Sequence, residues 1–167
     1  GYAWGIAEDA AKATRWLCSQ GVDGVVELAR VLAGPWVGQN LADLGADVIK
    51  VESPEGDGTR QWGPPWVERE NGAQEAAYYH ACNRGKRSMV ANFADADDLA
   101  KVAKLCGEAD VIIENFKVGT LAKFGLDYDS IARSNPAVVY CSITGFGQTG
   151  PRKDEPGYDF VSQAMSG

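Results

Sequence analysis

The residues that could most clearly bind a ligand lie where an apolar run ends. The segment Arg30-Val31-Leu32-Ala33-Gly34-Pro35 follows a β-branched run and precedes an amphipathic stretch, which places a glycine just before the start of an expected helix. Free N–H groups and the positive end of the helix dipole favour a phosphate there. Further along, Arg84, Lys86 and Arg87 form a basic island, which suits one polyphosphate ligand better than a polymer. A solvated loop is the alternative for that island.

Composition restricts the partners of the chain. A formal net charge of −7 disfavours nucleic acid and anionic membrane surfaces, because their phosphates would be repelled. No apolar run reaches the roughly 20 residues of a membrane span, and the first residues lack a leader pattern, so we expect a cytoplasmic protein. The 4 cysteines are scattered and His80 is the one histidine, which favours buried free thiols, a core or interface histidine, and no metal site.

Periodicity predicts an α/β domain. Apolar runs predict strands over residues 25–28, 47–52, 88–93, 109–114 and 137–143. Helical spacing predicts helices over residues 7–19, 36–44, 96–106, 118–124 and 128–134, with an irregular loop over 53–76. Strands that alternate with helices indicate a mostly parallel sheet. We divide the chain into an N-terminal helical extension, residues 1–21, and one α/β domain, residues 22–167.

The carboxyl ends of the strands are the expected ligand site. Ligands of open α/β sheets bind outside these ends, which here are residues 29–34, 52–60, 115–120 and 144–150. A dinucleotide is one candidate, because Glu52 ends the second strand as the ribose-binding acid of NAD domains does. The chain supplies only Gly34 and Gly38 in place of G-x-G-x-x-G, so NAD is disfavoured.

Five blocks in a fixed order point to a family. They are Val26-Glu27-Leu28 with Ala33-Gly34-Pro35, Leu44 to Glu52, Gly85-Lys86-Arg87-Ser88, Ala109 to Phe116, and Gly145-Phe146-Gly147-Gln148-Thr149-Gly150-Pro151. Over residues 24–167 the chain resembles the class III CoA transferases of the CaiB/BaiF and formyl-CoA transferase type, and the related α-methylacyl-CoA racemase. The resemblance implies a Rossmann-like large domain, truncated here, from an interlocked homodimer. We therefore expect either self-association or a missing C-terminal half.

The resemblance also implies a coenzyme A site across the strand-end loops. Its implied residues are Arg30, Val31, Leu32 and Ala33 at the pantetheine and thioester, Ser53 at the adenosine, Ala91 with its backbone near the adenine, Asn115 and Phe116 at the pyrophosphate and pantetheine, and Thr120 and Lys123 closing that side. Ser53 and Lys123 stand where relatives often carry arginine, so phosphate binding is expected to be weaker or to draw on Lys86 and Arg87. Without the resemblance, Asn115 is interpreted as a turn-forming residue after a strand and Phe116 as an aromatic of the core.

The implied reaction moves CoA from an acyl-CoA to a carboxylic acid. In the family an aspartate attacks the thioester, and we expect that aspartate beyond Gly167, so no nucleophile is assigned here. Tyr158 stands where the racemase carries its base, and a tyrosine is a poor base at neutral pH, which favours transferase over racemase. Tyr78 matches an acyl-site tyrosine. Both tyrosines have packing as the alternative, and a non-catalytic CoA-binding or dimerisation remnant is the alternative for the chain.

Overall fold

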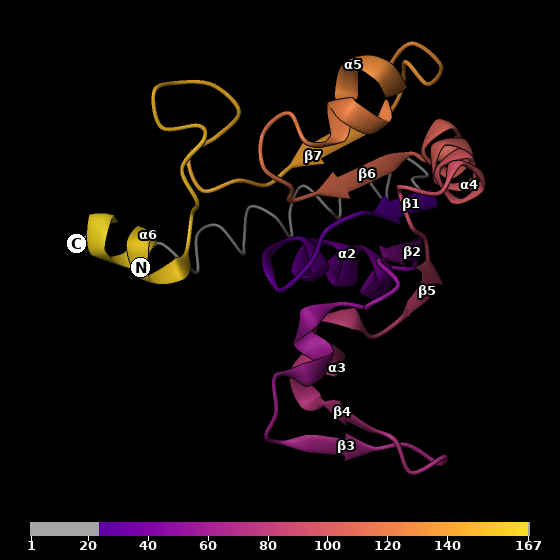
Figure 1. The fold of residues 1–167 in the computed structure, drawn as a ribbon, viewed down its shortest axis with the longest axis vertical. Helices are drawn as coiled ribbons and strands as arrows, with labels where there is room; N and C mark the ends of the chain where they lie inside the picture. The colour runs from indigo at the N-terminus through magenta and orange to yellow at the C-terminus, as the bar shows by residue number, and fades with distance from the viewer. Residues whose placement is uncertain (1–23, 167) are drawn as a thin grey trace.

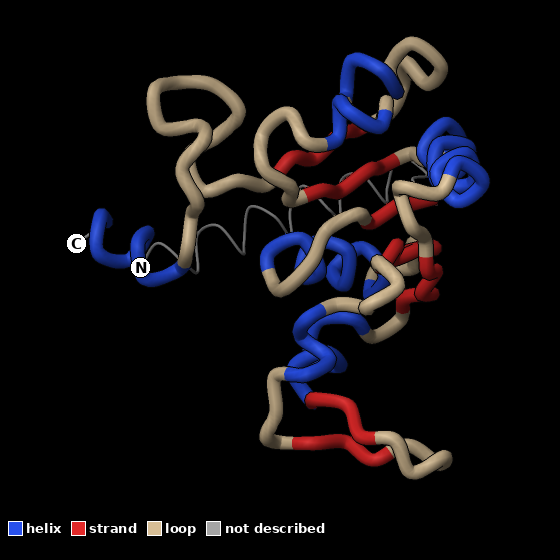
Figure 2. The backbone as a smooth tube through the Cα atoms, in the orientation of Figure 1, coloured by secondary structure: helices blue, strands red, loops and turns tan. Residues whose placement is uncertain are grey.

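Five short strands form one parallel sheet in the computed structural model, which describes residues 24–166 (Figures 1 and 2). They are β1 (Gly24–Glu27), β2 (Asp47–Glu52), β5 (Lys86–Val90), β6 (Val111–Glu114) and β7 (Val139–Ser142), in the order β5-β2-β1-β6-β7. Counted along the chain this is third, second, first, fourth, fifth, the order of doubly wound α/β sheets. The predicted mostly parallel α/β fold is confirmed. The predicted helix at 7–19 and the extension 1–21 lie outside the described residues.

Residues that alternate along the strands build a core on each face of the sheet. Val25 packs with Leu41 of α2 (Ala33–Asp43), whereas Val26 packs with Val102 and Cys106 of α4 (Ala96–Glu108). Because successive side chains of a strand point to opposite faces, a strand buried on both faces must be apolar almost throughout. Residues 25–27 of β1 and all of β6 are buried, so the middle of the sheet provides a base for the loops at its carboxyl edge.

Helix α2 begins at Ala33, three residues earlier than predicted, so Gly34 and Pro35 belong to its first turn. A Cβ on Gly34 would lie 1.9 Å from the Cβ of Ala29, and one on Gly38 would lie 2.0 Å from the Glu27 Oε2 atom. Both glycines therefore allow α2 to approach β1 closely. Gly34 was expected just before the helix, whereas it lies in the first turn of α2, and Ala29 occupies the space that its side chain would need.

The segment between β2 and β5 is structured, contrary to the predicted irregular loop. It holds a 3₁₀ turn η1 (Gly58–Gln61), an antiparallel hairpin of β3 (Trp66–Glu68) and β4 (Gln74–Ala76), and helix α3 (Ala77–Asn83). Asn71-Gly72 makes the hairpin turn, with Gly72 at φ 78° and its N–H donating to the Arg69 carbonyl. Figure 1 shows the hairpin extending away from the sheet, beyond α3.

The last third of the chain holds shorter elements than predicted. The helices expected at 118–124 and 128–134 are a 3₁₀ turn η2 (Leu121–Phe124) and one turn α5 (Tyr128–Ile131), and an unpredicted helix α6 (Asp159–Ser166) follows. None of the helices in residues 24–166 is long and apolar enough to cross a bilayer. Cys82, Cys106 and Cys141 are free thiols. His80 is no core residue, since its half-exposed side chain lies 3.1 Å from the Glu75 carboxylate.

Candidate functional site

One hollow of the sheet edge lies where the strand order reverses. Chain connections leave β1 and β6 in opposite directions, which opens a crevice outside their carboxyl ends. A cavity of about 600 Å³ occupies this place, within the range of small-molecule sites. Its walls come from the loops after β1, β2, β5 and β6 and from η2, with the lining residues Leu28, Arg30, Val51, Glu52, Ser53, Pro54, Glu55, Ala91, Asn92, Phe93, Asn115, Phe116, Lys117, Thr120 and Phe124. We call it the first hollow.

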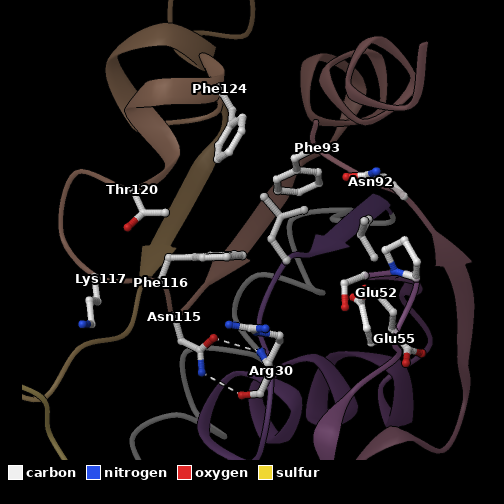
Figure 3. A pocket seen from close by; sticks show the side chains of 15 residues that line it. Arg30, Glu52, Glu55, Asn92, Phe93, Asn115, Phe116, Lys117, Thr120 and Phe124 are labelled. Carbon is white, nitrogen blue, oxygen red and sulfur yellow. Dashed lines mark hydrogen bonds between the residues drawn. The ribbon is translucent and has the colours of Figure 1, made fainter. Parts of the chain in front are cut away.

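Asn115 and Arg30 join the two central strands across this crevice. The Arg30 N–H donates to the Asn115 Oδ1 atom at 2.9 Å, and the Asn115 Nδ2 atom donates to the Arg30 carbonyl at 2.7 Å (Figure 3). The Arg30 guanidinium lies 5.5 Å from the centre of the Phe116 ring, as a cation–π pair. Asn115 thus fixes the backbone of the loop after β1. Phe116 orients the Arg30 guanidinium, and Arg30 lines the first hollow.

Three aromatic rings form the apolar wall. The Phe93 ring centroid lies 5.3 Å from that of Phe124 and 6.4 Å from that of Phe116. Phe93, from the loop after β5, and Phe124, from η2, were not among the predicted site residues (Figure 3). Their sequence signal is an aromatic at the end of an expected strand, for Phe93, and one at the end of an expected helix, for Phe124. The same signal also describes ordinary core residues.

The polar side of the first hollow carries mixed charge. Arg30 and Lys117 are its cations, and Glu55 is an exposed anion beside Ser53. The Glu55 backbone N–H and the Ser53 hydroxyl lower the pKa of that carboxyl, so it is ionised at neutral pH. Ala91 is buried and its N–H already donates to the Glu52 carbonyl at 2.9 Å, so that N–H is not available to a ligand.

A second hollow of about 630 Å³ adjoins the first and shares Asn115, Phe116 and Lys117 with it. It is lined by Leu32, Ala33 and Trp36 at the start of α2, by residues 143–145 after β7, and by residues 153–158 with Ser162. Tyr158 lies at its rim with 66% of its surface exposed. The predicted residues Leu32, Ala33 and Tyr158 therefore meet here, next to the remaining predicted residues of the first hollow.

Three predicted residues, Val31, Tyr78 and Lys123, line neither hollow. Tyr78, on α3, packs edge-to-face on Trp62 with ring centroids 6.1 Å apart and lines neither hollow. Lys123, on η2, is exposed and also lines neither. Lys117, which sequence reasoning missed, is the lysine that both hollows share. It follows Asn115 and Phe116 directly, so its position after β6 was the available signal.

Val31 adopts a left-handed backbone between the hollows. Its φ is 69°, and it is the one non-glycine residue with positive φ in the described part of the chain. For a β-branched residue this conformation costs about 1–3 kcal/mol. Its N–H donates to the Asp57 Oδ2 atom at 3.3 Å. Val31 itself lines neither hollow, so its contribution to the site is the turn that it makes.

A buried cluster of four charges lies beneath this loop. The Lys50 Nζ atom is 2.9 Å from both Glu27 and Asp57, and the Lys86 Nζ atom is 2.6 Å from the second Glu27 oxygen. Burial lowers the pKa of Lys86, whereas Glu27 and Asp57 overcome burial at Lys50 and raise its pKa. Two cations and two anions balance, and Lys50 also donates to the Ala29 carbonyl at 3.1 Å, so the cluster anchors the end of β1.

The basic island is therefore not a phosphate site. Lys86 is buried on Glu27, Arg84 pairs with Asp43, and Arg87 pairs with Asp47. Asp47 is the first residue of β2, and the next residue, Val48, pairs with Lys86 at the start of β5. These pairs therefore lie at the amino ends of the strands, opposite the edge that carries the hollows. The sequence pattern identified the three basic residues but could not identify the acidic residues that pair with them. Those acidic residues lie about 40 residues or more away in the chain.

Glu52 is likewise engaged, which argues against the ribose role considered for it. Its carboxylate accepts from the Arg60 Nε atom at 2.8 Å, the Tyr79 hydroxyl at 2.9 Å and the Ser88 hydroxyl at 2.6 Å. Burial opposes ionisation, but these donors outweigh it and lower the pKa of Glu52 to about 2. Arg60, stacked on the Tyr79 ring at 3.7 Å, also pairs with Glu75, so Glu52 ties the sheet to the hairpin.

The fold and the site define a doubly wound α/β protein with two adjoining hollows at the carboxyl ends of its strands. Residues 21–167 match the family described as CoA-transferase family III. The chain belongs to that family.

Curated relatives and solved structures agree with this membership. The chain is 63% identical over 145 residues to the succinate–glutarate CoA-transferase of Agrobacterium fabrum, and 46% identical over 144 residues to the human succinyl-CoA:glutarate CoA-transferase. It spans 36% and 32% of their lengths, with 86% of this chain covered in each case. A CaiB/BaiF family protein from Brucella suis has a TM-score of 0.83 at 63% identity, over 86% of this chain and 38% of that one. A hypothetical protein from Mycobacterium tuberculosis has a TM-score of 0.76 at 38% identity, over 87% and 40%.

Proposed function

We propose that this chain binds coenzyme A or an acyl-CoA across the two hollows, as the nucleotide-binding part of an enzyme that transfers CoA between carboxylic acids. The observation that carries the proposal is the pair of adjoining hollows at the switch point of the sheet, shared through Asn115, Phe116 and Lys117. A long ligand with a planar base, charged phosphates and a thin arm matches two connected hollows better than one compact ligand does.

The charges and rings indicate how the ligand lies. The adenine is expected in the first hollow near the Ala91 carbonyl, which can accept from its amino group. The phosphates are expected towards Arg30 and Lys117, because the Glu55 carboxylate would repel them near Ser53. The pantetheine arm then passes Phe116 towards Leu32 and Ala33 in the second hollow. Thr120 closes the first hollow, and Lys123 contributes at most a distant charge.

The acid that attacks the thioester is not assigned to any residue of this chain. In the reaction implied by the resemblance, an enzyme carboxylate attacks the thioester and displaces CoA thiolate, which forms a mixed anhydride. The thiolate then attacks the enzyme's carbonyl carbon, which releases the donor acid and leaves an enzyme–CoA thioester. The acceptor carboxylate displaces CoA in the same way, and the thiolate attacks the acceptor carbonyl to give the new acyl-CoA and the free enzyme carboxylate. We place that aspartate in sequence beyond Gly167. Tyr158, at the rim of the second hollow, disfavours α-proton abstraction, and with it the racemase alternative.

Dicarboxylic acids are the proposed acyl groups. The relatives of 63% and 46% identity are named for succinate or succinyl-CoA and glutarate. We therefore propose succinyl-CoA as donor and glutarate as acceptor. We also propose a cytoplasmic homo-oligomer, and the buried free thiols of Cys82 and Cys106 support the cytoplasmic location.

A chimaera tests the proposal. Residues 1–167 are joined to the remainder of the Agrobacterium fabrum relative, and transfer of CoA from succinyl-CoA to isotope-labelled glutarate is followed. Formation of labelled glutaryl-CoA is expected. A folded chimaera that binds CoA but transfers none would favour the alternative, a CoA-binding or dimerisation module without turnover. Deuterium exchange at the α-carbon of a 2-methylacyl-CoA would instead favour the racemase.

A further inference from the structure

The turn at Val31 separates the two hollows. Arg30, before it, lines the first hollow, whereas Leu32 and Ala33, after it, line the second. The direction in which α2 begins therefore depends on the left-handed conformation of Val31. A side chain branched at Cβ disfavours that conformation, and it persists only where surrounding contacts fix it.

Asp57 makes a contact that can fix the conformation of Val31, because its carboxylate accepts the Val31 N–H. Its carboxylate receives four donors: the Val31 N–H at 3.3 Å and Lys50 Nζ at 2.9 Å on Oδ2, and the Thr59 N–H at 2.9 Å and hydroxyl at 2.8 Å on Oδ1. Asp57 is 2% exposed, and its own N–H donates to the Glu52 Oε2 atom at 2.8 Å. Hydrogen bonds from Thr59 and Lys50 outweigh the effect of burial and lower the pKa of Asp57. The carboxylate is thus held from several sides.

We propose that Asp57 is a positioning residue, which fixes Val31 in its left-handed conformation and so directs the first N–H groups of α2 into the second hollow. Asp57 lines neither hollow, so it acts through Val31. Asn115 holds the preceding residue, Arg30, and the Cys82 Sγ atom lies 3.8 Å from the Val31 carbonyl. The catalytic consequence rests on the proposed function, whereas the effect on the backbone does not.

Asp57→Asn is the informative variant. Each carboxylate oxygen of Asp57 accepts hydrogen bonds from N–H or O–H donors. In either orientation of the asparagine amide, its NH₂ group would therefore face donors and could not replace the lost acceptor. The variant keeps the side-chain volume but loses the charge that Lys50 requires. Val31 is then expected to relax to negative φ. Asp47→Asn is the matched control, since it removes a carboxylate that pairs with Arg87 at the surface.

The first measurement reports the backbone of the 167-residue chain by NMR. A strong NOE between the N–H and Hα protons of Val31, which positive φ brings close together, is expected in the parent and in Asp47→Asn. It is expected to weaken in Asp57→Asn. An unchanged NOE in folded Asp57→Asn would overturn the proposal. If that variant does not fold, Thr59→Val removes one donor to Asp57 with little change of shape. The same NOE should then weaken partly, and an unchanged NOE would again overturn the proposal.

The second measurement uses the chimaera with succinyl-CoA and glutarate. Asp57→Asn is expected to lower kcat per folded molecule about tenfold or more, while KM for succinyl-CoA changes little. A tenfold loss corresponds to roughly 1.4 kcal/mol of transition-state stabilisation. Adding Val31→Gly is expected to restore kcat, because glycine adopts positive φ without steric cost. A merely structural role would reduce the folded fraction and leave kcat unchanged. That result, or a loss that Val31→Gly does not repair, would overturn the proposal. An inactive parent chimaera would count against the proposed function, and the NOE would still decide the role of Asp57.

Discussion

The buried charge cluster gives the sharpest prediction about stability, through Glu27→Gln. Glu27 is 0% exposed and its two oxygens accept from Lys50 and Lys86, whose side chains are 1% and 2% exposed. The substitution turns a neutral cluster into one with an unbalanced positive charge and places an amide NH₂ against an ammonium group. Removing one partner from a buried ion pair costs about 3–5 kcal/mol.

The expected loss is large for a domain of this size. Folded domains are stable by about 5–15 kcal/mol, so Glu27→Gln should lower the free energy of unfolding in urea by about 3–5 kcal/mol and the melting temperature by about 10 °C. Asp47→Asn breaks the exposed pair with Arg87 and should leave the free energy of unfolding nearly unchanged, because exposed ion pairs contribute little to stability.

The loss should also depend on pH in one direction. Burial already lowers the pKa of Lys86, and without Glu27 that pKa falls further. A lysine with a depressed pKa in the folded state destabilises while it is protonated, and this effect disappears as pH rises towards its ordinary value. The deficit of Glu27→Gln should therefore shrink between about pH 8 and 10. A deficit below about 1 kcal/mol at pH 7, or one that grows with pH, would refute this reasoning.

Three further results are expected. The low pKa of Glu52, about 2 against 4.5, should contribute about 3 kcal/mol above pH 4.5, lost as pH falls towards 2; denaturation from pH 6 to 2.5 should show this slope, and Glu52→Gln should flatten it. Gly38→Ala should destabilise by about 1–3 kcal/mol, because its Cβ meets Glu27 at 2.0 Å, whereas Gly107→Ala in α4, with open space around it, should not. Glu55→Gln should raise affinity for coenzyme A about twofold to fivefold in calorimetry, and a fall would place the phosphates elsewhere.

The sheet edge was predictable because it depends on local patterns. Apolar runs gave the strands, and the rule that ligands lie outside the carboxyl ends of parallel strands gave the loops of Arg30, Ser53 and Asn115. All three now line the first hollow. Neither rule gives the order of the strands, which was needed to see that Arg30 and Asn115 face each other at the switch point.

Long-range pairing was not predictable from spacing. Lys86 looked like part of a phosphate site because its neighbours Arg84 and Arg87 are basic, yet its partner Glu27 lies 59 residues earlier. The conformation of Val31 was hidden for a similar reason. Valine disfavours positive φ, and the Asp57 carboxylate that holds it comes from a segment predicted to be irregular. The hairpin, in contrast, had a signal in Asn71-Gly72 that composition rich in glycine and proline obscured.

A titration of coenzyme A into the isotope-labelled 167-residue chain tests the site most directly. Amide shifts are expected at Arg30, Ala91, Asn115 and Phe116, with Phe116→Ala weakening binding and the β3–β4 hairpin unaffected. No shift at millimolar coenzyme A, or shifts confined to residues outside the two hollows, would contradict a coenzyme A site at the switch point of this sheet.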